Sequence, residues 1–419
     1  MPAYWVETLG CPKNQVDTDK LIGTLHADGY APASSPEDAD LVVVNTCAFI
    51  EAARTESIDT VLALADARQE GARLVVTGCM AERYSADLAA TLPEVDLVAG
   101  FGVPVTLGRR GAVTSRDVAG LDLLNLPRPR SAVPWAYVKV AEGCDRSCGF
   151  CAIPSFRGRQ RSRTPASILS EVEALDVQEI VLVAQDLASY GKDRPADLGA
   201  GSIVALVEQV AARVPRTRLL YLYPSDLSDG LIDVIGAGTG GPNYDLSLQH
   251  VSKRLLRRMR RWGDGERFLD RIAEIRRRYP DAAFRSSFIV GYPGETEADH
   301  DQMLAFLRRA RLDWVGFFAY SQEDGTHAAG LDAKVPSGLA AERLAEVRAV
   351  QDDITAVHRA ELVGTTLEVL VDLPGVARGH REAPEIDGIV AVPSSLGAGT
   401  FHKVEITAVA GPDLEAVPV

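Results

Sequence analysis

The sequence predicts an α/β protein in three parts: an N-terminal Rossmann-like α/β domain, a central partial (β/α)6 barrel and a small C-terminal all-β, OB-like domain. Three observations support this prediction. A strand–cysteine–helix pattern repeats early in the chain, six strand-like runs then alternate with helical patterns, and short β runs broken by Gly and Pro come last. The expected limits are 1–126 for the first domain, 127–134 for a Pro-rich linker, 135–363 for the barrel and 364–419 for the last domain.

In the first domain, three apolar runs each end at a cysteine: YWVETLGC at Cys11, LVVVNTC at Cys47 and RLVVTGC at Cys79. The steps of 36 and 32 residues match the length of one βαβ unit. Because the carboxyl ends of parallel strands meet at one edge of a sheet, we expect the three cysteines to be neighbours there. A fourth strand is expected at VDLVAG. The stripe of the helix that should face the sheet is Ile58, Val61, Leu62 and Ala65.

The barrel is predicted from six strand-like runs: YVKVA, EIVLVAQ, RLLYLYP, YDLSLQ, AFRSSFIVG and WVGFFAYS. Helical patterns such as 168–175 and 267–277 lie between them. Six units are fewer than the eight of a closed TIM barrel, so a partial barrel is expected. A long polar helix over 337–363 and the β runs TTLEVLVD, EIDGIVAV and FHKVEITAVAG complete the chain.

Composition excludes several classes of protein. The chain of 419 residues is 46% hydrophobic and 24% charged, and it has neither a signal-peptide pattern nor a run of about 18 apolar residues. We therefore expect a cytoplasmic protein that does not enter a membrane. Six cysteines are present and none follows Cys151, a pattern that favours metal ligands over disulfides in this compartment.

The most informative stretch is EGCDRSCGFC, which contains Cys144, Cys148 and Cys151 in C-x3-C-x2-C spacing after the first barrel strand. Three thiolates on a 4Fe–4S cluster leave one iron open. At the mouth of a barrel, such an iron can bind S-adenosylmethionine (SAM) and pass it an electron, which yields a 5′-deoxyadenosyl radical. The alternatives on spacing alone are an incomplete zinc ribbon and coincidence.

The extended stretch EGCDRSCGFCAIPSFRGRQRSR resembles the radical-SAM motif of the methylthiotransferases. The resemblance covers nearly the whole chain. It includes LGCPKNQVD, NTCAFIEAARTESID, AQDLASYG, SLQHVS, FIVGYPGETEADH, YSQEDGTHA and APEIDGIV. These stretches are similar to the family members that modify an aspartate of protein twelve of the small ribosomal subunit. The resemblance implies a methylthiotransferase domain, a radical-SAM barrel and a C-terminal TRAM domain.

The resemblance also implies a second 4Fe–4S cluster on Cys11, Cys47 and Cys79, for which the alternative is three small buried hydrophobic residues. The second cluster would hold an exogenous sulfur, which one SAM methylates, while a second SAM yields the radical that takes a hydrogen from the aspartate β-carbon. No side-chain acid–base pair is expected. The implied partners are the ribosomal protein, a sulfur donor and an electron donor such as flavodoxin or ferredoxin.

Further cofactor-binding candidates lie around the mouth. Phe150 could lie on the SAM adenine or pack under the loop, and Gln185 and Gln249 end strands where the resemblance places the SAM amino group, although either could be an ordinary polar strand end. GYPGETE could lie near SAM or simply form a turn and helix start, with Thr296 as the cap. We expect His250, His300 and His327 to be structural. The basic runs, Arg157/Arg159/Arg161/Arg163 and 253–261, are expected to be solvated faces or partners of phosphates and carboxylates, and one or two of these arginines could hold the SAM carboxylate.

Charge bears on the choice of substrate. The last domain has the cations Arg378, Arg381 and Lys403 and the carboxylates Glu368, Asp372, Glu382, Glu385, Asp387, Glu405, Asp413 and Glu415. Such a surface would repel RNA and attract a basic protein. We therefore expect a ribosomal protein as substrate and no tRNA. The alternatives are a tRNA adenosine methylthiotransferase of the same fold and, more distantly, a non-catalytic iron–sulfur electron carrier, although carriers close their clusters with four ligands.

Overall fold

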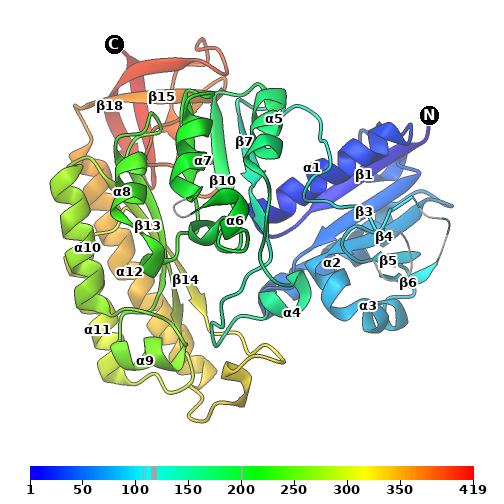
Figure 1. Ribbon diagram of the computed structural model, residues 1–419, viewed down its shortest axis with the longest axis horizontal. Coiled ribbons are helices and arrows are strands. Elements are labelled where there is room, and N and C mark those ends of the chain that lie inside the picture. Colours follow the sequence, from blue (N-terminus) through cyan, green and yellow to red (C-terminus); the bar gives the residue numbers. More distant parts are fainter. Residues whose placement is uncertain (107, 109, 115–119, 200–201) are drawn as a thin grey trace.

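The computed structural model describes residues 1–106, 108, 110–114, 120–199 and 202–419. Its first part is a parallel sheet with strand order β2-β1-β3-β4-β5-β6 (Figure 1). The strands are β1 (Ala3–Thr8), β2 (Ala31–Pro32), β3 (Leu41–Thr46), β4 (Arg73–Gly78), β5 (Leu97–Ala99) and β6 (Gly111–Val113). The helices are α1 (Pro12–Ala27), α2 (Glu51–Ala67) and α3 (Cys79–Thr91). The Rossmann-like prediction and the expected strands are confirmed.

The buried stripe of α2 differs from the prediction. Val61 is fully buried as expected, but Leu62 is 38% exposed and Leu64 lies in the core instead. On the same buried face, the Ser57 hydroxyl accepts from the Cys47 amide at 3.1 Å and lies within donor distance of the Ala53 and Cys47 carbonyls. The face of α2 that packs on the sheet thus includes a polar residue.

The central part contains the six predicted strands, all parallel, in two sheets of three, β11-β10-β7 and β12-β13-β14. A bridge between Leu222 and Leu246 joins them into one partial barrel. The strands are β7 (Trp135–Lys139), β10 (Glu179–Val183), β11 (Arg216–Leu219), β12 (Asn243–Gln249), β13 (Ala283–Val290) and β14 (Trp314–Ala319), with a small hairpin of β8 (Ala141–Glu142) and β9 (Arg161–Ser162). Alternate strand residues such as Val138 and Leu182 face outward into the core under the helices.

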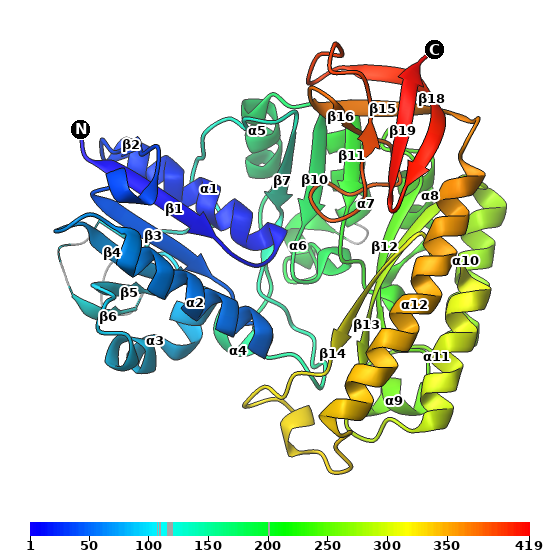
Figure 2. The same ribbon diagram turned by 180° about the vertical axis from the view of Figure 1, so that it is seen from behind.

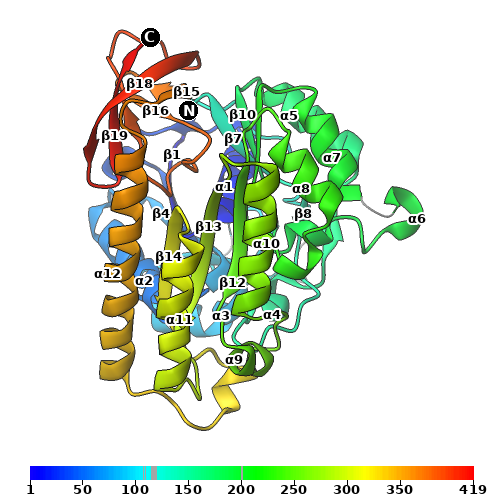
Figure 3. The same cartoon turned by 90° about the vertical axis from the view of Figure 1, so that its left-hand side faces the viewer.

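Helices cover the outside of this barrel (Figure 3). The helices that cover it are α5 (Pro165–Leu175), α7 (Ser202–Ala211), α8 (Asp229–Gly236), α9 (Lys253–Arg258), α10 (Gly265–Arg278), α11 (Glu297–Ala310) and α12 (Ser337–Glu361). The short helix α4 (Ile153–Arg157) lies beside α3 of the N-terminal domain, and the short helix α6 (Pro195–Leu198) protrudes from the barrel. Thr296 caps α11 in a reciprocal capping box with Asp299, as predicted. In the described residues, no helix is both long and apolar enough to cross a membrane.

The C-terminal part is a closed barrel with strand order β15-β16-β17-β19-β18. Its strands are β15 (Thr366–Leu373), β16 (Val376–Arg378), β17 (Val390–Ala391), β18 (Phe401–Ala410) and β19 (Asp413–Pro418). The predicted all-β domain is thus confirmed, whereas the residue limits proposed for each domain stay predictions.

The C-terminal domain closes one end of the central barrel (Figure 2). Arg378 binds Glu179, the first residue of β10, at 2.9 Å. Ala383 packs inside the barrel against Trp135 and Tyr137, and the Tyr137 hydroxyl donates to the Pro384 carbonyl at 2.9 Å. The domain therefore covers the amino ends of the strands, which leaves the carboxyl ends as the open mouth.

The carboxylates of this domain are not all on its surface, contrary to our expectation. Asp372 binds the buried Arg378, Asp387 binds Arg285 of β13, and Glu382 binds Arg359 of α12 at 2.5 Å. Burial makes these charges depend on their partners, which come largely from the barrel and its helices. The exposed carboxylates are Glu368, Glu385, Glu405 and Glu415.

The buried Glu382 predicts a difference between two like substitutions. Glu382→Lys would place a cation beside Arg359 in a site that is 1% exposed, and we expect a loss of about 3–5 kcal/mol in unfolding free energy. Glu415→Lys, on the exposed face of the same domain, should cost less than about 0.5 kcal/mol. Urea denaturation of both variants measures the difference, and equal midpoints would contradict the buried pair.

Candidate functional site

The structure brings Cys11, Cys47 and Cys79 together at the carboxyl edge of the N-terminal sheet. Two glycines allow the approach. Gly10 has φ +96°, and a Cβ there would lie 2.9 Å from the Cβ of Cys47. Gly78 has φ +91°, and a Cβ there would lie 2.2 Å from Oδ1 of Asn45.

Asn14 holds these loops from the start of α1. Its fully buried amide donates to the carbonyls of Leu9 at 2.9 Å and Thr46 at 3.1 Å, and its Oδ1 accepts from Cys79 Sγ at 3.5 Å. Burial, with a contribution from the neighbouring Cys79 and Cys11, raises the pKa of Cys47 to about 12. A cation that binds these sulfurs would therefore displace protons from them.

Cys144, Cys148 and Cys151 lie in one loop at the barrel mouth. The Cys144 amide donates to the Gly158 carbonyl at 3.1 Å, and the Cys151 amide to the Cys148 carbonyl at 3.1 Å. Burial raises the pKa of Cys144 to about 11 and that of Cys151 to about 12. Arg261 donates to Cys148 Sγ at 3.4 Å.

No three His, Cys, Asp or Glu side chains among the described residues are arranged to hold one metal ion. A four-iron cluster distributes its thiolate ligands over several metal atoms, so its ligands need not converge on one point. Thiolate is the usual protein ligand of such a cluster, and each cysteine group provides three thiols. The three residues of each group lie close together, on glycine-shaped or hydrogen-bonded loops.

Two charged side chains enclose an aromatic ring beside the second cysteine group. The guanidinium groups of Arg146 and Arg261 lie 3.9 Å and 4.1 Å from the Tyr223 ring centre. Arg146 also donates to Asp186 at 2.5 Å and binds Asp226. The Nε of Arg261 is buried and has no partner among the described residues. Arg261 is thus the arginine of the predicted basic run best placed for a ligand carboxylate.

Gln185 also has an unused polar atom at the mouth. Its amide donates to Glu142 at 2.6 Å, which leaves its buried Oε1 without a donor among the described residues. An ammonium group is the kind of ligand that such an oxygen accepts from. The residues present therefore fit the amino acid part of SAM.

The other predicted cofactor residues are placed less specifically. Gln249 lies at the end of β12, beside an irregularity in the register with β13, and its φ is 70°. A non-glycine residue in this conformation is strained, and such strain is often found at functional sites. Phe150 is half-buried and packs against the barrel core, as the packing alternative predicts. His250 accepts from the Ser252 amide at 3.0 Å, and burial lowers its pKa to about 3. His300 contacts Glu346.

A buried cluster of four charges lies between the two cysteine groups. It contains Asp17 of α1, Lys139 of β7, Glu142 of β8 and Arg157 of α4. Lys139 binds Asp17 and, at 2.8 Å, Glu142. Arg157 binds Asp17 at 3.1 Å and Glu142 at 3.0 Å. Burial alone would raise the pKa of Glu142, but Arg157 and Lys139 lower it, so this carboxylate stays ionised.

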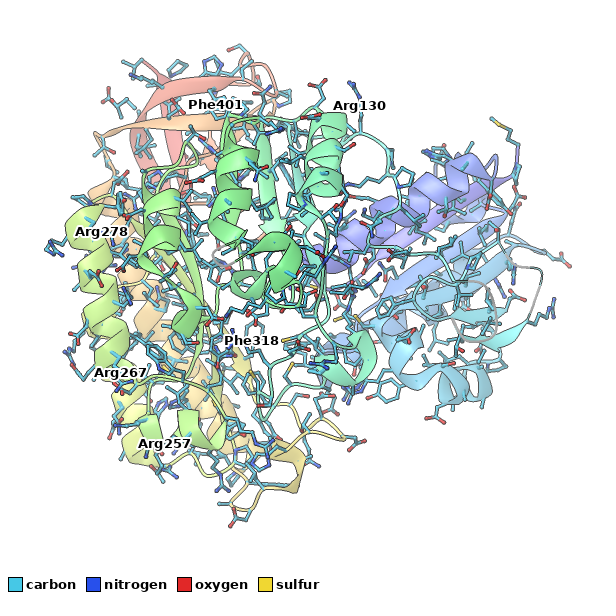
Figure 4. The ribbon with its side chains drawn as sticks, in the orientation of Figure 1. Arg130, Arg257, Arg267, Arg278, Phe318 and Phe401 are labelled. Atoms are coloured by element: carbon cyan, nitrogen blue, oxygen red, sulfur yellow. The ribbon has the colours of Figure 1, made fainter. Side chains whose placement is uncertain are left out.

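The basic run that contains Arg157 includes both expected kinds of arginine, those paired with carboxylates and those exposed to solvent. Arg157 and Arg163 are buried in ion pairs, and only Arg159 and Arg161 of that run are exposed. The long basic helices of the barrel do present solvated arginines, among them Arg257 and Arg267, on the outside of the molecule (Figure 4). A hollow of about 400 Å³ near Arg276 and Arg311 lies on the outer helices, away from the cysteines.

Sequence reasoning missed Lys13, two residues after Cys11. Its ammonium lies 3.7 Å from the ring centre of Tyr221, and the structure shows no carboxylate within ion-pair distance of it among the described residues. Tyr221 follows β11 in a left-handed conformation with φ 66°. A cation held on an aromatic ring at the mouth is available to a substrate carboxylate.

Two exposed aromatic residues also belong to this region. Phe49 is 44% exposed and follows Cys47, and Phe318 of β14 is 45% exposed. Figure 4 labels Phe318 near the centre of the view. The sequence alone did not identify either residue, because the exposure of an aromatic side chain depends on the assembled fold.

Three family models match the chain in order. They are described as uncharacterized protein family UPF0004 over residues 3–100, the radical SAM superfamily over 138–307 and the TRAM domain over 363–419. Among solved structures, the radical SAM methyltransferase TsrM from Kitasatospora setae, with cobalamin and a [4Fe-4S] cluster bound, has a TM-score of 0.53 at 15% identity. The match covers 93% of this chain and 82% of that one, and it supports the fold.

Curated relatives named ribosomal protein uS12 methylthiotransferase RimO match almost the full length. The relative from Saccharopolyspora erythraea is 40% identical over 98% of this chain and 94% of its own. Those from Moorella thermoacetica and Streptomyces coelicolor are 39% and 38% identical, each over 96% of its own length and over 96% and 98% of this chain.

Proposed function

Because the chain belongs to the RimO family of radical-SAM methylthiotransferases, we propose that it adds a methylthio group to the β-carbon of an aspartate in protein twelve of the small ribosomal subunit. An enzyme of this family uses an iron–sulfur cluster and SAM. The proposed reaction consumes two SAM per turnover, one as methyl donor and one for hydrogen removal. The names of the full-length relatives are the observation that carries the choice of substrate.

Six cysteines would hold two clusters. Cys144, Cys148 and Cys151 hold one, and Cys11, Cys47 and Cys79 hold the other. When bound, the first cluster supplies the electron that cleaves SAM, and the second supplies a site for the sulfur that is transferred. Gln185 accepts from the SAM ammonium, Arg261 donates to its carboxylate, and Gln249 and Phe150 border the same space.

The substrate enters between the N-terminal domain and the barrel mouth. Lys13 donates to the carboxylate of the target aspartate, which leaves the β-carbon between the two cysteine groups. Phe49 and Phe318 contact the apolar parts of the substrate loop. No side chain is required as a general acid or base.

The exposed surface of the C-terminal domain favours a basic protein over RNA. Four exposed carboxylates face solvent there against one exposed cation, Lys403, whereas Arg378 is held in internal ion pairs and Arg381 binds Asp281 and Asp313. A tRNA substrate would need cations at this surface. The proposed partners also include a sulfur donor and an electron donor such as flavodoxin or ferredoxin, and a ribosomal substrate places the reaction in the cytoplasm.

The substrate assignment predicts which product gains mass. Reconstituted enzyme, SAM and dithionite would be incubated with purified ribosomal protein twelve or with total tRNA, and both products weighed by mass spectrometry. We expect one methylthio group on the protein, with S-adenosylhomocysteine and 5′-deoxyadenosine formed in equal amounts. A methylthio mark on adenosine and none on protein would favour the tRNA alternative.

The two-cluster assignment predicts iron content. Reconstituted wild-type protein should hold about eight irons, and replacement of either cysteine triplet by Ala should leave about four. SAM cleavage should be lost only when Cys144, Cys148 and Cys151 are replaced. Eight irons in the variant that lacks Cys11, Cys47 and Cys79 would refute the second cluster.

The proposed role of Lys13 predicts that its substitution weakens the binding of the protein substrate and leaves SAM cleavage intact. Lys13→Met should raise the Kd for the ribosomal protein by roughly 10–100-fold, the effect of one lost charged hydrogen bond. SAM cleavage without protein substrate should continue. Lys334→Met, at an exposed position after the barrel, is the control. An unchanged Kd in the Lys13 variant, at full iron content, would rule out this role.

A further inference from the structure

Arg157 extends from the segment that follows the second cysteine group to a cysteine of the first group. It is the last residue of α4, six positions after Cys151. Its backbone therefore belongs to the segment of the central part that follows the cysteines of the barrel mouth. Its guanidinium, however, lies in the N-terminal domain, where Nη2 donates to Cys79 Sγ at 3.1 Å and to Asn14 Oδ1 at 2.7 Å. The side chain is 3% exposed.

The remaining contacts fix the orientation of this guanidinium. Nη1 donates to Asp17 at 3.1 Å and to both oxygens of Glu142 at 3.0 Å and 3.1 Å. Its carbon lies 4.4 Å from the ring centre of Phe101. Each of the two terminal nitrogens thus serves a different set of acceptors, an arrangement that the single ammonium of a lysine cannot reproduce.

A hydrogen bond to a ligand sulfur favours the more negative state of an iron–sulfur cluster, and so raises its reduction potential. A buried positive charge acts in the same direction, since little solvent screens it. Among the described residues, Cys79 Sγ accepts a hydrogen bond from Arg157 and donates one to Asn14. Of these two partners, only Arg157 is charged.

We propose that Arg157 is a positioning residue that sets the reduction potential of the cluster on Cys11, Cys47 and Cys79 and ties that potential to the docking of the N-terminal domain on the barrel. This inference rests on the proposed second cluster. It goes beyond the proposed function because it assigns control of that cluster to a residue of the barrel. Separation of the two domains would break the contact with Cys79 and lower the potential.

A purely structural role for Arg157 is the competing explanation, and the chain offers a matched control. Arg83 of α3 also crosses between the two domains, where it binds Glu323 after β14 at 2.7 Å with a side chain 8% exposed. No contact between Arg83 and a cysteine is recorded in the described residues. Arg83→Gln therefore weakens the docking of the two domains and leaves the donors to sulfur in place. Arg157→Gln weakens docking and also removes a donor to Cys79 Sγ.

The test uses the full-length chain with Cys144, Cys148 and Cys151 replaced by Ala, so that one cluster remains. Its one-electron reduction by dithionite would be followed by electron paramagnetic resonance, and thermal unfolding of each apo variant would be measured in parallel. We expect a more negative potential for Arg157→Gln and a smaller negative shift for Arg157→Lys. Arg83→Gln should lower the unfolding temperature and keep the parent potential.

An unchanged potential in both Arg157 variants, with four irons bound, would overturn the inference. An equal shift in the Arg83 variant would also overturn it, since docking alone would then explain the effect. Failure of the parent itself to bind iron at Cys11, Cys47 and Cys79 would refute the second cluster of the proposed function. That outcome is recognised before any Arg157 variant is made.

Discussion

The arrangement of this molecule depends on four charges that are buried together between two domains. Asp17 and Glu142 provide two carboxylates, and Lys139 and Arg157 provide two cations. Lys139, Asp17 and Arg157 lose nearly all of their hydration and Glu142 most of it, so each depends on the others, and loss of one partner from a buried pair typically costs about 3–5 kcal/mol. Since the four residues come from α1, β7, β8 and α4, these ion pairs hold the N-terminal sheet against the barrel.

That position brings together two edges of the same kind. In the sheet and in the barrel, the cysteines lie directly after the carboxyl ends of parallel strands or in the loops that follow those strands. Open α/β folds and barrels place their ligands at this edge. The C-terminal domain fills the opposite end of the barrel with Ala383 and its neighbours. The barrel is left with one open mouth. This mouth is bordered by both cysteine groups, by Lys13 and by the side-chain oxygen of Gln185 that has no donor among the described residues.

Local patterns were sufficient to predict the three-part fold, because apolar runs of strand length and their spacing do not depend on distant contacts. They also indicated that three distant cysteines would meet, because topology alone brings strand ends together. Prediction failed where contacts distant in sequence decide the outcome. Leu64 takes the buried position on α2 that was expected for Leu62, and Glu382 is buried because Arg359 of α12 lies opposite it. Arg157 looked like one of several basic residues because its partners in the N-terminal domain, among them Asp17 and Asn14, lie far from it in the sequence.

The central claim is that the two cysteine groups hold two clusters close together across one mouth. Electron paramagnetic resonance of the fully reduced enzyme tests it, because two nearby paramagnetic clusters split and broaden each other's signals. The spectrum of the wild-type enzyme would be compared with the sum of the spectra of the two single-cluster variants. We predict extra splitting in the wild type that the sum lacks. A wild-type spectrum identical to that sum would contradict the arrangement.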